Sequence, residues 1–249
     1  MNIILKSPAE LEKMRASGML VRRLLDELRS MVRPGVSTLV LEQAAEKRIA
    51  EAGARAAFKG YHDYPCVLCT SVNHEIVHGI PSARRVLQEG DILKIDIGVV
   101  LDGYYGDAAT TVPVGRISPE VQKLVDVTEE ALQRAIERVR LNNRLHDICG
   151  TIQDYVENQG FSVVRDFVGH GIGRQLHEDP QVPNYRGGPN PRLREGMVLA
   201  IEPMVNTGSP NARVLDDHWT AVTEDGGYSA HFEHTVAVTG NGPWVLTQP

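Results

Sequence analysis

Residues 94–111, KIDIGVVLDGYYGDAATT, are the stretch that most constrains how this chain folds. The odd positions of residues 93–101 are all large and apolar, whereas Lys94, Asp96 and Gly98 alternate with them, which is the period of a β-strand. The dipeptide Asp102-Gly103 favours a tight turn with positive φ at both central positions, so the residues after it read as the returning strand. The sequence therefore predicts a two-stranded hairpin.

Two aspartates share one face of this predicted hairpin. With a two-residue turn, the numbers of facing residues sum to 205, so Asp96 faces Ala109 and Asp107 faces Gly98. The two carboxylates are then diagonal neighbours, about 7–8 Å apart at the backbone, and are able to converge on shared cations. Two interpretations stay open at this point: a metal or catalytic site, or a turn aspartate and a strand-end aspartate with a hydrogen-bonded partner.

The composition excludes several classes of protein. The 249 residues, 42% of them hydrophobic, are enough for a substantial core in one large domain or two small ones. The opening MNIILKSPAELEK has too short an apolar run for a signal peptide, and no stretch approaches the ~20 apolar residues of a membrane span, so we expect a cytoplasmic protein without a membrane partner. The net charge of −6 and the lack of a Lys/Arg run argue against specific nucleic-acid binding.

The three cysteines do not predict a covalent or metal framework. Cys66, Cys69 and Cys149 are too few for a set of disulfides, which agrees with a reducing compartment. Cys66 and Cys69 have the spacing of a zinc knuckle or redox pair, but no second such pair follows, so we do not expect a structural zinc.

Two helix pairs follow each other along the chain. A serine cap followed by proline starts a helix at Ser7 that runs to about Val32, and the same signal at Ser118 starts one that runs to about Arg140. Second helices run from about 37 to 53 and from about 145 to 160. Because the starts are offset by 111 residues and the ends by 107, we interpret residues 1–249 as a single domain with two similar halves, about 7–115 and 118–239. Two unrelated helix pairs are the alternative.

The second half supplies further polar residues in strand contexts. We predict a strand at 161–167, a turn at 168–173, a functional loop at 180–191, and strands at 197–202 and 228–239. Glu202 ends the first of the last two strands, and Glu233 lies in the second, on the same face as His231. His170 lies between two glycines of the predicted turn.

Four acids in strands, at positions 96, 107, 202 and 233, are hard to bury without a cation that gathers them. A pair of divalent ions about 3.5–4 Å apart would do so, because carboxylates suit hard or borderline cations and bridge two such ions. His170 is the natural nitrogen ligand. Taken singly, an arginine partner for Glu233 and a turn or helix-cap role for His170 remain alternatives.

The order Asp96, Asp107, His170, Glu202 and Glu233 resembles that of the type I methionine aminopeptidases of the short bacterial kind, within the pita-bread metallopeptidase group. The stretches that carry the resemblance are NHEIVHGIP at 73–81, the hairpin at 96–110, GHGIG at 169–173 with His177-Glu178, AIEPM at 200–204 and FEHT at 232–235. The similarity covers about residues 7–239. It implies an α+β pita-bread fold, in which two halves related by a pseudo-twofold axis pack helices on a curved antiparallel sheet.

This resemblance implies removal of the initiator methionine from nascent proteins and peptides whose second residue is small. Asp107 and Glu233 would bridge two divalent ions, Asp96 would complete one ion's site, and His170 with Glu202 the other's. The candidate metals are Co, Mn and Fe, followed by Zn and Ni. A metal-bound hydroxide would attack the first peptide bond, and Glu202 would pass a proton toward the leaving amine. The implied partners are nascent polypeptide N-termini, with transient ribosome contact, and the implied state is a monomer.

Further residues match the family's substrate-binding positions. By the resemblance, His78 contacts the leaving-side nitrogen and His177 the carbonyl oxygen that develops charge. The implied methionine pocket combines aromatic and soft groups suited to a flexible thioether: Tyr61, His62, Tyr64, Cys69, Leu176 and Trp219.

The chain departs from the family pattern at three positions. Phe58 stands where some relatives have a cysteine, Leu176 where many have an aromatic residue, and His231 where glutamine is common. His231 would either hydrogen-bond around the metal ligands or add a nitrogen near the metals. Three backbone oxygens match a monovalent-cation site of some members: those of Asn73, Glu75 and Ser229.

Two alternatives share the same fold. Proline-specific relatives, the Xaa-Pro aminopeptidases and prolidases, carry the same five ligands but usually have a large additional N-terminal domain, whereas about six residues precede the first helix here. Non-catalytic pita-bread proteins that bind RNA or other partners have lost ligands, whereas all five are present here. We therefore expect a methionyl aminopeptidase.

Overall fold

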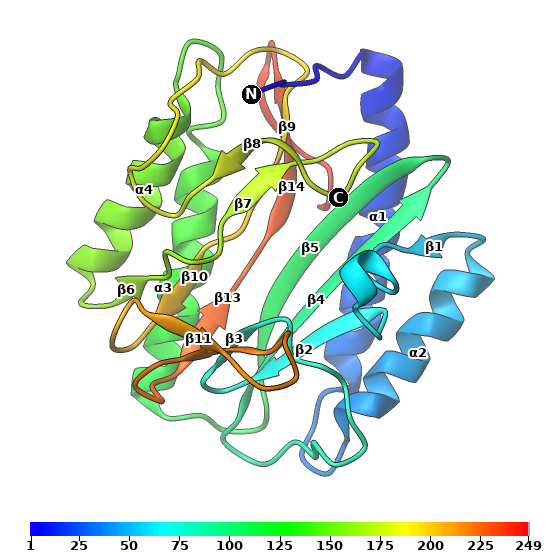
Figure 1. Cartoon of the computed structure of the whole chain (residues 1–249), viewed down its shortest axis with the longest axis vertical. Coiled ribbons are helices and arrows are strands. Elements are labelled where there is room, and N and C mark those ends of the chain that lie inside the picture. Colours follow the sequence, from blue (N-terminus) through cyan, green and yellow to red (C-terminus); the bar gives the residue numbers. More distant parts are fainter. Residues whose placement is uncertain (249) are drawn as a thin grey trace.

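The computed structural model describes residues 1–248, in which helices flank antiparallel sheets (Figure 1). The helices are α1 (Pro8–Met31), α2 (Thr38–Glu51), α3 (Pro119–Ile136) and α4 (Leu145–Asn158), with a 3₁₀ turn η1 (Tyr61–Asp63). The strands are β1 (Arg55–Ala56), β2 (Leu68–Val72), β3 (Glu75–Val77), β4 (Ile92–Leu101), β5 (Tyr104–Pro113), β6 (Ser162–Val163), β7 (Gly169–Gly171), β8 (Glu178–Val182), β9 (Val198–Ile201), β10 (Met204–Asn206), β11 (Ala212–Val214), β12 (Ala221–Thr223), β13 (Ser229–His231), β14 (His234–Thr239) and β15 (Gly242–Val245).

The predicted helix starts are confirmed. The Ser7 side chain accepts from the backbone N–H of Glu10, whose carboxylate accepts from the Ser7 N–H in return, and this pairing satisfies two free donors at the start of α1. Ser118 caps α3 in a related way. Helix α3 ends at Ile136 rather than near Arg140, because short bonds such as that from Arg138 N–H to the Ala135 carbonyl tighten its last turn.

Each helix pair covers its own apolar core. Leu28 of α1 and Leu41 of α2 pack in one buried cluster with Ile95 of β4. A second cluster joins α3 and α4 to β9, β10 and β14. In Figure 1 the two helix pairs lie on opposite sides of the molecule, with the strands between them. None of the helices within residues 1–248 combines the length and the hydropathy that a bilayer crossing requires.

The hairpin of β4 and β5 has the predicted register. Asp96 pairs with Ala109 and Gly98 with Asp107, and the turn residues Asp102 and Gly103 have φ values of 50° and 80°. β4 is the central strand of its sheet, because β1 and β2 pair with its other edge. Asp96 therefore projects from a strand that hydrogen bonds hold on two edges, and Asp107 projects from its partner β5.

A line of hydrogen bonds joins β5 to the last strands of the chain. Thr111 exchanges two bonds with the backbone of His231, Glu233 N–H donates to the Ala109 carbonyl, and Asp107 exchanges two bonds with Thr235. The residue numbers of these three pairs all sum to 342, as expected for antiparallel neighbours. This seam places Asp107 beside Glu233, although 126 residues separate them in the chain.

The predicted turn at 168–173 is wrong, because Gly169–Gly171 is strand β7, which lies between β9 and β8 in the five-stranded sheet β15-β14-β9-β7-β8. The glycines serve close strand approach rather than a turn. A Cβ on Gly169 would lie 2.4 Å from the Ala200 carbonyl oxygen, and one on Gly171 would lie 2.3 Å from that of Asp179. Such distances admit only glycine.

Three other predicted boundaries also differ. The strand expected at 161–167 is confined to β6, and the loop expected from Pro180 begins only after β8. The strand expected at 228–239 is divided into β13 and β14. The division lies opposite Pro203, which has no N–H to donate to a ladder and separates β9 from β10 in the same way.

Candidate active site

The interruption at Pro203 creates one half of the site. Ile201 pairs with His234 and Met204 with His231, and both pairs sum to 435, so Glu202 and Glu233 stand opposite each other between the paired segments. Opposed side chains on one face lie about 4.5–5.5 Å apart at Cβ. Two carboxylates are thus brought together where regular pairing stops.

His170 joins these acids through strand β7. It pairs with Ala200, which makes it a diagonal neighbour of Glu202 on the same face of the sheet. Its Nδ1 lies 2.9 Å from the Gly171 carbonyl oxygen, a contact that assigns the proton to Nδ1. The lone pair of Nε2 is then free to face the carboxylates.

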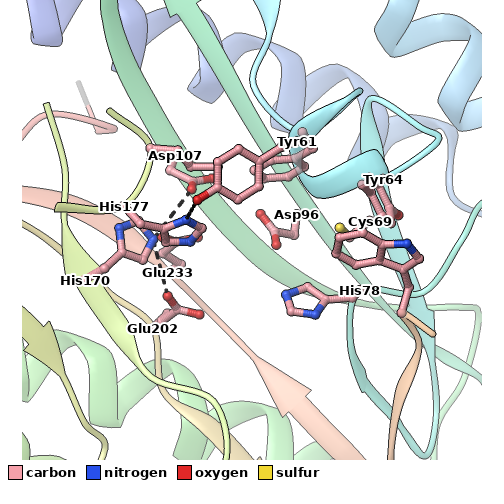
Figure 2. Close-up of a pocket in the computed structure, with 13 residues that line it drawn as sticks. Tyr61, Tyr64, Cys69, His78, Asp96, Asp107, His170, His177, Glu202 and Glu233 are labelled. Atoms are coloured by element: carbon pink, nitrogen blue, oxygen red, sulfur yellow. Dashed lines mark hydrogen bonds and ion pairs between the residues drawn. The ribbon is translucent and has the colours of Figure 1, made fainter. Parts of the chain in front are cut away.

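These side chains line one cavity of about 160 Å³, and Figure 2 shows those of Asp96, Asp107, His170 and Glu202 pointing into it. The lining residues are Phe58, Tyr61, Tyr64, Cys69, His78, Asp96, Asp107, His170, Leu176, His177, Glu202, Trp219 and Glu233. Of the metal-ligand, catalytic and methionine-pocket residues expected from the sequence, His62 alone is outside this lining. It is exposed, and its ring packs edge-on against Tyr61.

The spacing of the ligand atoms fits metal coordination. Asp107, His170 and Glu233 each offer an atom within 4.8 Å of the other two. His170 Nε2 lies 4.0 Å from Oδ2 of Asp107 and 3.6 Å from Oε1 of Glu202. Ligands that bind one ion at about 2.0–2.2 Å lie about 3–4 Å from one another. The arrangement is therefore already close to that of a metal site.

One oxygen on each of three acids of this cluster lacks a hydrogen-bond partner. Within residues 1–248, Oδ1 of Asp96, Oδ1 of Asp107 and Oε1 of Glu233 are buried without a hydrogen bond. Among residues 1–248, the ion-pair partners of this group are histidines, and none is a lysine or arginine. Unpaired buried carboxylates are costly, so this donor set fits divalent cations that would neutralise it.

The protonation states follow from burial. Burial raises the pKa of Asp107 to about 7, and burial together with mutual repulsion raises the pKa values of Asp96, Glu202 and Glu233. Burial lowers the pKa of His170 to about 3, so its ring is neutral and able to act as a ligand at physiological pH. Metal binding at this cluster releases protons from the acids.

Two further histidines face the same cavity. The Tyr61 hydroxyl lies 2.7 Å from His177 Nδ1, and the His177 ring centroid is 4.2 Å from that of His170. His78 has a φ of 61°, which is a strained conformation for a residue with a side chain, and burial lowers its pKa to about 4. Burial also lowers the pKa of His177, so both rings are neutral at physiological pH, and each has one nitrogen that donates and one that accepts.

The other wall of the cavity is largely apolar. Tyr64, Cys69 and Leu176 are 3%, 5% and 2% exposed, and the Trp219 ring packs edge-on against Tyr64 with centroids 5.0 Å apart. Phe58 also lines this wall, although the sequence showed it only as a departure from the family pattern. Only the register of β1 on β4 brings Phe58 close: a Cβ on Gly98 would lie 2.8 Å from its ring.

A buried lysine stands next to this site. Lys94 is 1% exposed, and its Nζ donates to the carbonyl oxygens of Asn73 and Ser229 at 2.7 and 2.9 Å. These are two of the three oxygens that the resemblance assigns to a monovalent cation. Burial lowers the pKa of this ammonium group to about 7.

Comparison with known proteins agrees with this geometry. The model of metallopeptidase family M24 matches residues 12–240. Methionine aminopeptidase 1 of Bacillus subtilis is 53% identical over 248 residues, which are 99% of each chain. The crystal structure of methionine aminopeptidase from Thermotoga maritima has a TM-score of 0.97 at 46% identity and covers 100% of both chains.

A proline-specific enzyme is more distant. The Xaa-Pro dipeptidase of Bacillus anthracis is 21% identical with a TM-score of 0.78, and the match covers 98% of this chain but 62% of the dipeptidase. That similarity concerns the fold alone. Together the comparisons confirm the predicted α+β pita-bread class and a requirement for divalent metal ions. The chain therefore belongs to metallopeptidase family M24.

Proposed function

We propose that this protein is a methionine aminopeptidase, which hydrolyses the first peptide bond of chains that begin with methionine and continue with a small residue. One observation carries the proposal: the cluster of four acids and His170 opens onto the same small cavity as an apolar wall. A cavity of this kind has room for one terminal side chain beside the reacting bond. The names of relatives that are about half identical over the whole chain support the same activity.

Two divalent ions are the proposed cofactors, and Mn²⁺, Fe²⁺ and Co²⁺ come before Zn²⁺ and Ni²⁺ as candidates. Asp107 and Glu233 would bridge the ions, Asp96 would complete one site, and His170 with Glu202 the other. When bound, such ions lower the pKa of water and polarise a carbonyl group. The Lys94 ammonium, rather than a monovalent cation, would hold the carbonyl oxygens of Asn73 and Ser229.

The remaining steps belong to side chains of this protein. Glu202 accepts a proton from the attacking water and returns it to the leaving amine, a role suited to a carboxyl group whose pKa is raised by burial. If the Tyr61 hydroxyl donates to His177 Nδ1, the other ring nitrogen, Nε2, carries a proton that it donates to the substrate carbonyl oxygen. The neutral ring of His78 binds the amide nitrogen on the leaving side.

The apolar wall selects the side chain. Tyr64, Cys69, Leu176 and Trp219 line the cavity with aromatic and sulfur groups, against which a thioether packs favourably. Tyr61 lines it too, while His62 would act only from outside, through its contact with the Tyr61 ring. In the cell, we propose that the protein acts in the cytoplasm as a monomer on nascent chains near the ribosome.

The test compares hydrolysis of Met-Ala-Ser, Met-Leu-Ser and Xaa-Pro-Ser peptides before and after exhaustive chelation, followed by the return of Mn²⁺, Fe²⁺ or Co²⁺. We expect Met-Ala-Ser to be cleaved at its first bond, chelation to abolish cleavage, and an added ion to restore it. Preferential cleavage of the Xaa-Pro peptide, or activity that survives chelation, would contradict the proposal.

A further inference from the structure

His231 is a buried histidine that none of the steps above uses. Its residue surface is 1% exposed, and neither ring nitrogen has a hydrogen-bond partner within residues 1–248. A buried polar atom left unpaired costs about 1–3 kcal/mol, and the unpaired groups of native proteins tend to have a function. The ring is nevertheless close to the site, since its Nε2 lies 3.6 Å from Oε2 of Glu202.

The backbone fixes where this ring stands. The His231 N–H donates to Thr111 Oγ1 at 2.9 Å, and the Thr111 hydroxyl donates to the His231 carbonyl at 2.7 Å. On its other edge His231 pairs with Met204 of β10, two residues after Glu202. Because both edges of the strand are bonded, the backbone of His231 cannot move away from Glu202 without breaking these bonds.

The two oxygens of Glu202 face different histidines. Oε1 lies 3.6 Å from Nε2 of His170, the proposed ligand, whereas Oε2 lies 3.6 Å from Nε2 of His231. Among the described residues His231 belongs to no group of three mutually close ligand atoms, in contrast to His170. An imidazole ring always carries at least one N–H, and Oε2 of Glu202 is the carboxylate oxygen that Nε2 of His231 faces.

We propose that His231 is a positioning residue for Glu202: its Nε2–H donates to Oε2 and thereby leaves Oε1 directed at the metal-binding side. This inference rests on the proposed function and names a residue beyond the five ligands. A carboxylate that both binds an ion and transfers a proton needs a fixed orientation, and a hydrogen bond to its second oxygen supplies it. Without the donor, Glu202 is free to rotate away from the reacting atoms.

Three substitutions separate this role from a structural one. In His231→Gln the side-chain amide nitrogen reaches about as far as Nε2, in His231→Asn it reaches only as far as Nδ1, and His231→Leu has no donor. We expect His231→Leu and His231→Asn to lower kcat for Met-Ala-Ser by about 10- to 100-fold with KM unchanged, and His231→Gln to restore most of the loss. Calorimetric titration should give the wild-type number of bound Mn²⁺ ions in all three.

Four results would overturn the proposal. They are wild-type kcat in a folded His231→Leu variant, a His231→Gln variant as impaired as His231→Leu, the loss of one Mn²⁺ ion, and a crystal structure of the Mn²⁺-loaded protein in which Nε2 is far beyond the ~2.9 Å expected of a hydrogen bond. If His231→Leu does not fold, the test is the comparison of kcat between His231→Gln and His231→Asn, which should be higher in His231→Gln. Wild-type protein that does not hydrolyse Met-Ala-Ser would contradict the proposed function instead, and the crystal structure would still test the His231 contact.

Discussion

Two buried polar centres lie on one strand of this protein, and their charged groups find partners in different ways. Lys94 and Asp96 are two residues apart on β4 and therefore project from the same face. Lys94 supplies a positive charge to the carbonyl oxygens of Asn73 and Ser229. Asp96 instead joins three other acids that have no lysine or arginine partner among residues 1–248.

The difference teaches how to tell a structural charge from a functional one. Burial moves both centres toward their neutral forms: it lowers the pKa of Lys94 to about 7 and raises that of Asp107 to about 7. The lysine, however, has its partners in place, whereas one oxygen each of Asp96, Asp107 and Glu233 has no hydrogen-bond partner in the described part of the chain. The chain therefore completes the first centre by itself and requires cations from solution to complete the second.

The largest expected effect comes from removing a bridging acid. Asp107→Ala should bind fewer Mn²⁺ ions per chain and should also lose activity, because this carboxylate lies between both proposed ion positions. Substitution of residues that merely orient metal ligands costs about 10–100-fold, so the activity loss here should exceed about 100-fold. Calorimetry with Mn²⁺ and peptide hydrolysis measure the two effects. Glu129→Ala, which removes an exposed carboxylate from α3, is the control and should change neither.

A second prediction concerns metal and pH. In the metal-free fold the pKa of Asp107 is raised from 3.8 to about 7, so between these values the folded chain holds more protons than the unfolded chain, and this group's contribution to stability falls as pH rises. Bound metal requires the deprotonated form and reverses that sign. The gap in melting temperature between Mn²⁺-loaded and metal-free protein should therefore widen from pH 5.5 to 7.5.

Differential scanning calorimetry at matched ionic strength measures this gap. At a free Mn²⁺ concentration 100 times Kd the stabilisation should reach about 2.7 kcal/mol. The contribution of Lys94 to the pH dependence is the same in the Mn²⁺-loaded and metal-free protein, so it cancels from the difference between them. A gap that is constant or narrows with rising pH would contradict the raised pKa values of the cluster.

The lysine centre gives a smaller effect, on stability. Lys94→Ala removes the ammonium donor from the carbonyl oxygens of Asn73 and Ser229, although that of Asn73 still accepts from the Ser229 N–H. A buried acceptor that loses its donor costs about 1–3 kcal/mol, partly offset here because the buried charge is gone. We expect K⁺ to restore part of the stability of Lys94→Ala relative to choline at equal ionic strength, since the shortened side chain leaves space between the same oxygens. Chemical denaturation in K⁺ and in choline measures the free energy of unfolding that this comparison needs.

Lys94→Met is the matched control for this experiment, because its side chain fills the space without providing a donor. It should be destabilised and should not respond to K⁺. Wild-type stability in both variants, or an equal response of both to K⁺, would show that the ammonium does not act as the cation of this centre.

The smallest expected effect concerns the uncharged contact between Tyr61 and His177. Tyr61→Phe removes the hydroxyl that lies 2.7 Å from His177 Nδ1 and should lower kcat by about 2- to 10-fold, the equivalent of about 0.5–1.5 kcal/mol for one hydrogen bond. His62→Ala, next to it but outside the cavity lining, should have a smaller effect. A larger loss in His62→Ala than in Tyr61→Phe would mean that His62 enters the site when substrate binds.

The local elements of this fold were predictable from the sequence, because their causes lie within a few residues. The Ser7 and Ser118 caps, the register of β4 on β5 and the face shared by Asp96 and Asp107 follow from hydrogen bonds and side-chain alternation that the chain carries locally. The predictions failed where contacts between strands distant in the sequence determine the local structure. The glycines beside His170 indicated a turn, but they are there because β8 and β9 pass too close for a Cβ.

Only the tertiary structure decided how the halves of the site meet. The seam between β5 and residues 231–235 places Asp107 beside Glu233, and the interruption at Pro203 sets Glu202 opposite Glu233. It also directs Lys94 to two carbonyl oxygens and His231 to Glu202. The sequence by itself determined which residues carry charge and which face of a strand they occupy. It did not determine which of those charges find a partner, because the partners come from other segments, up to 135 residues away for Lys94 and Ser229, that the packing of the sheets brings together.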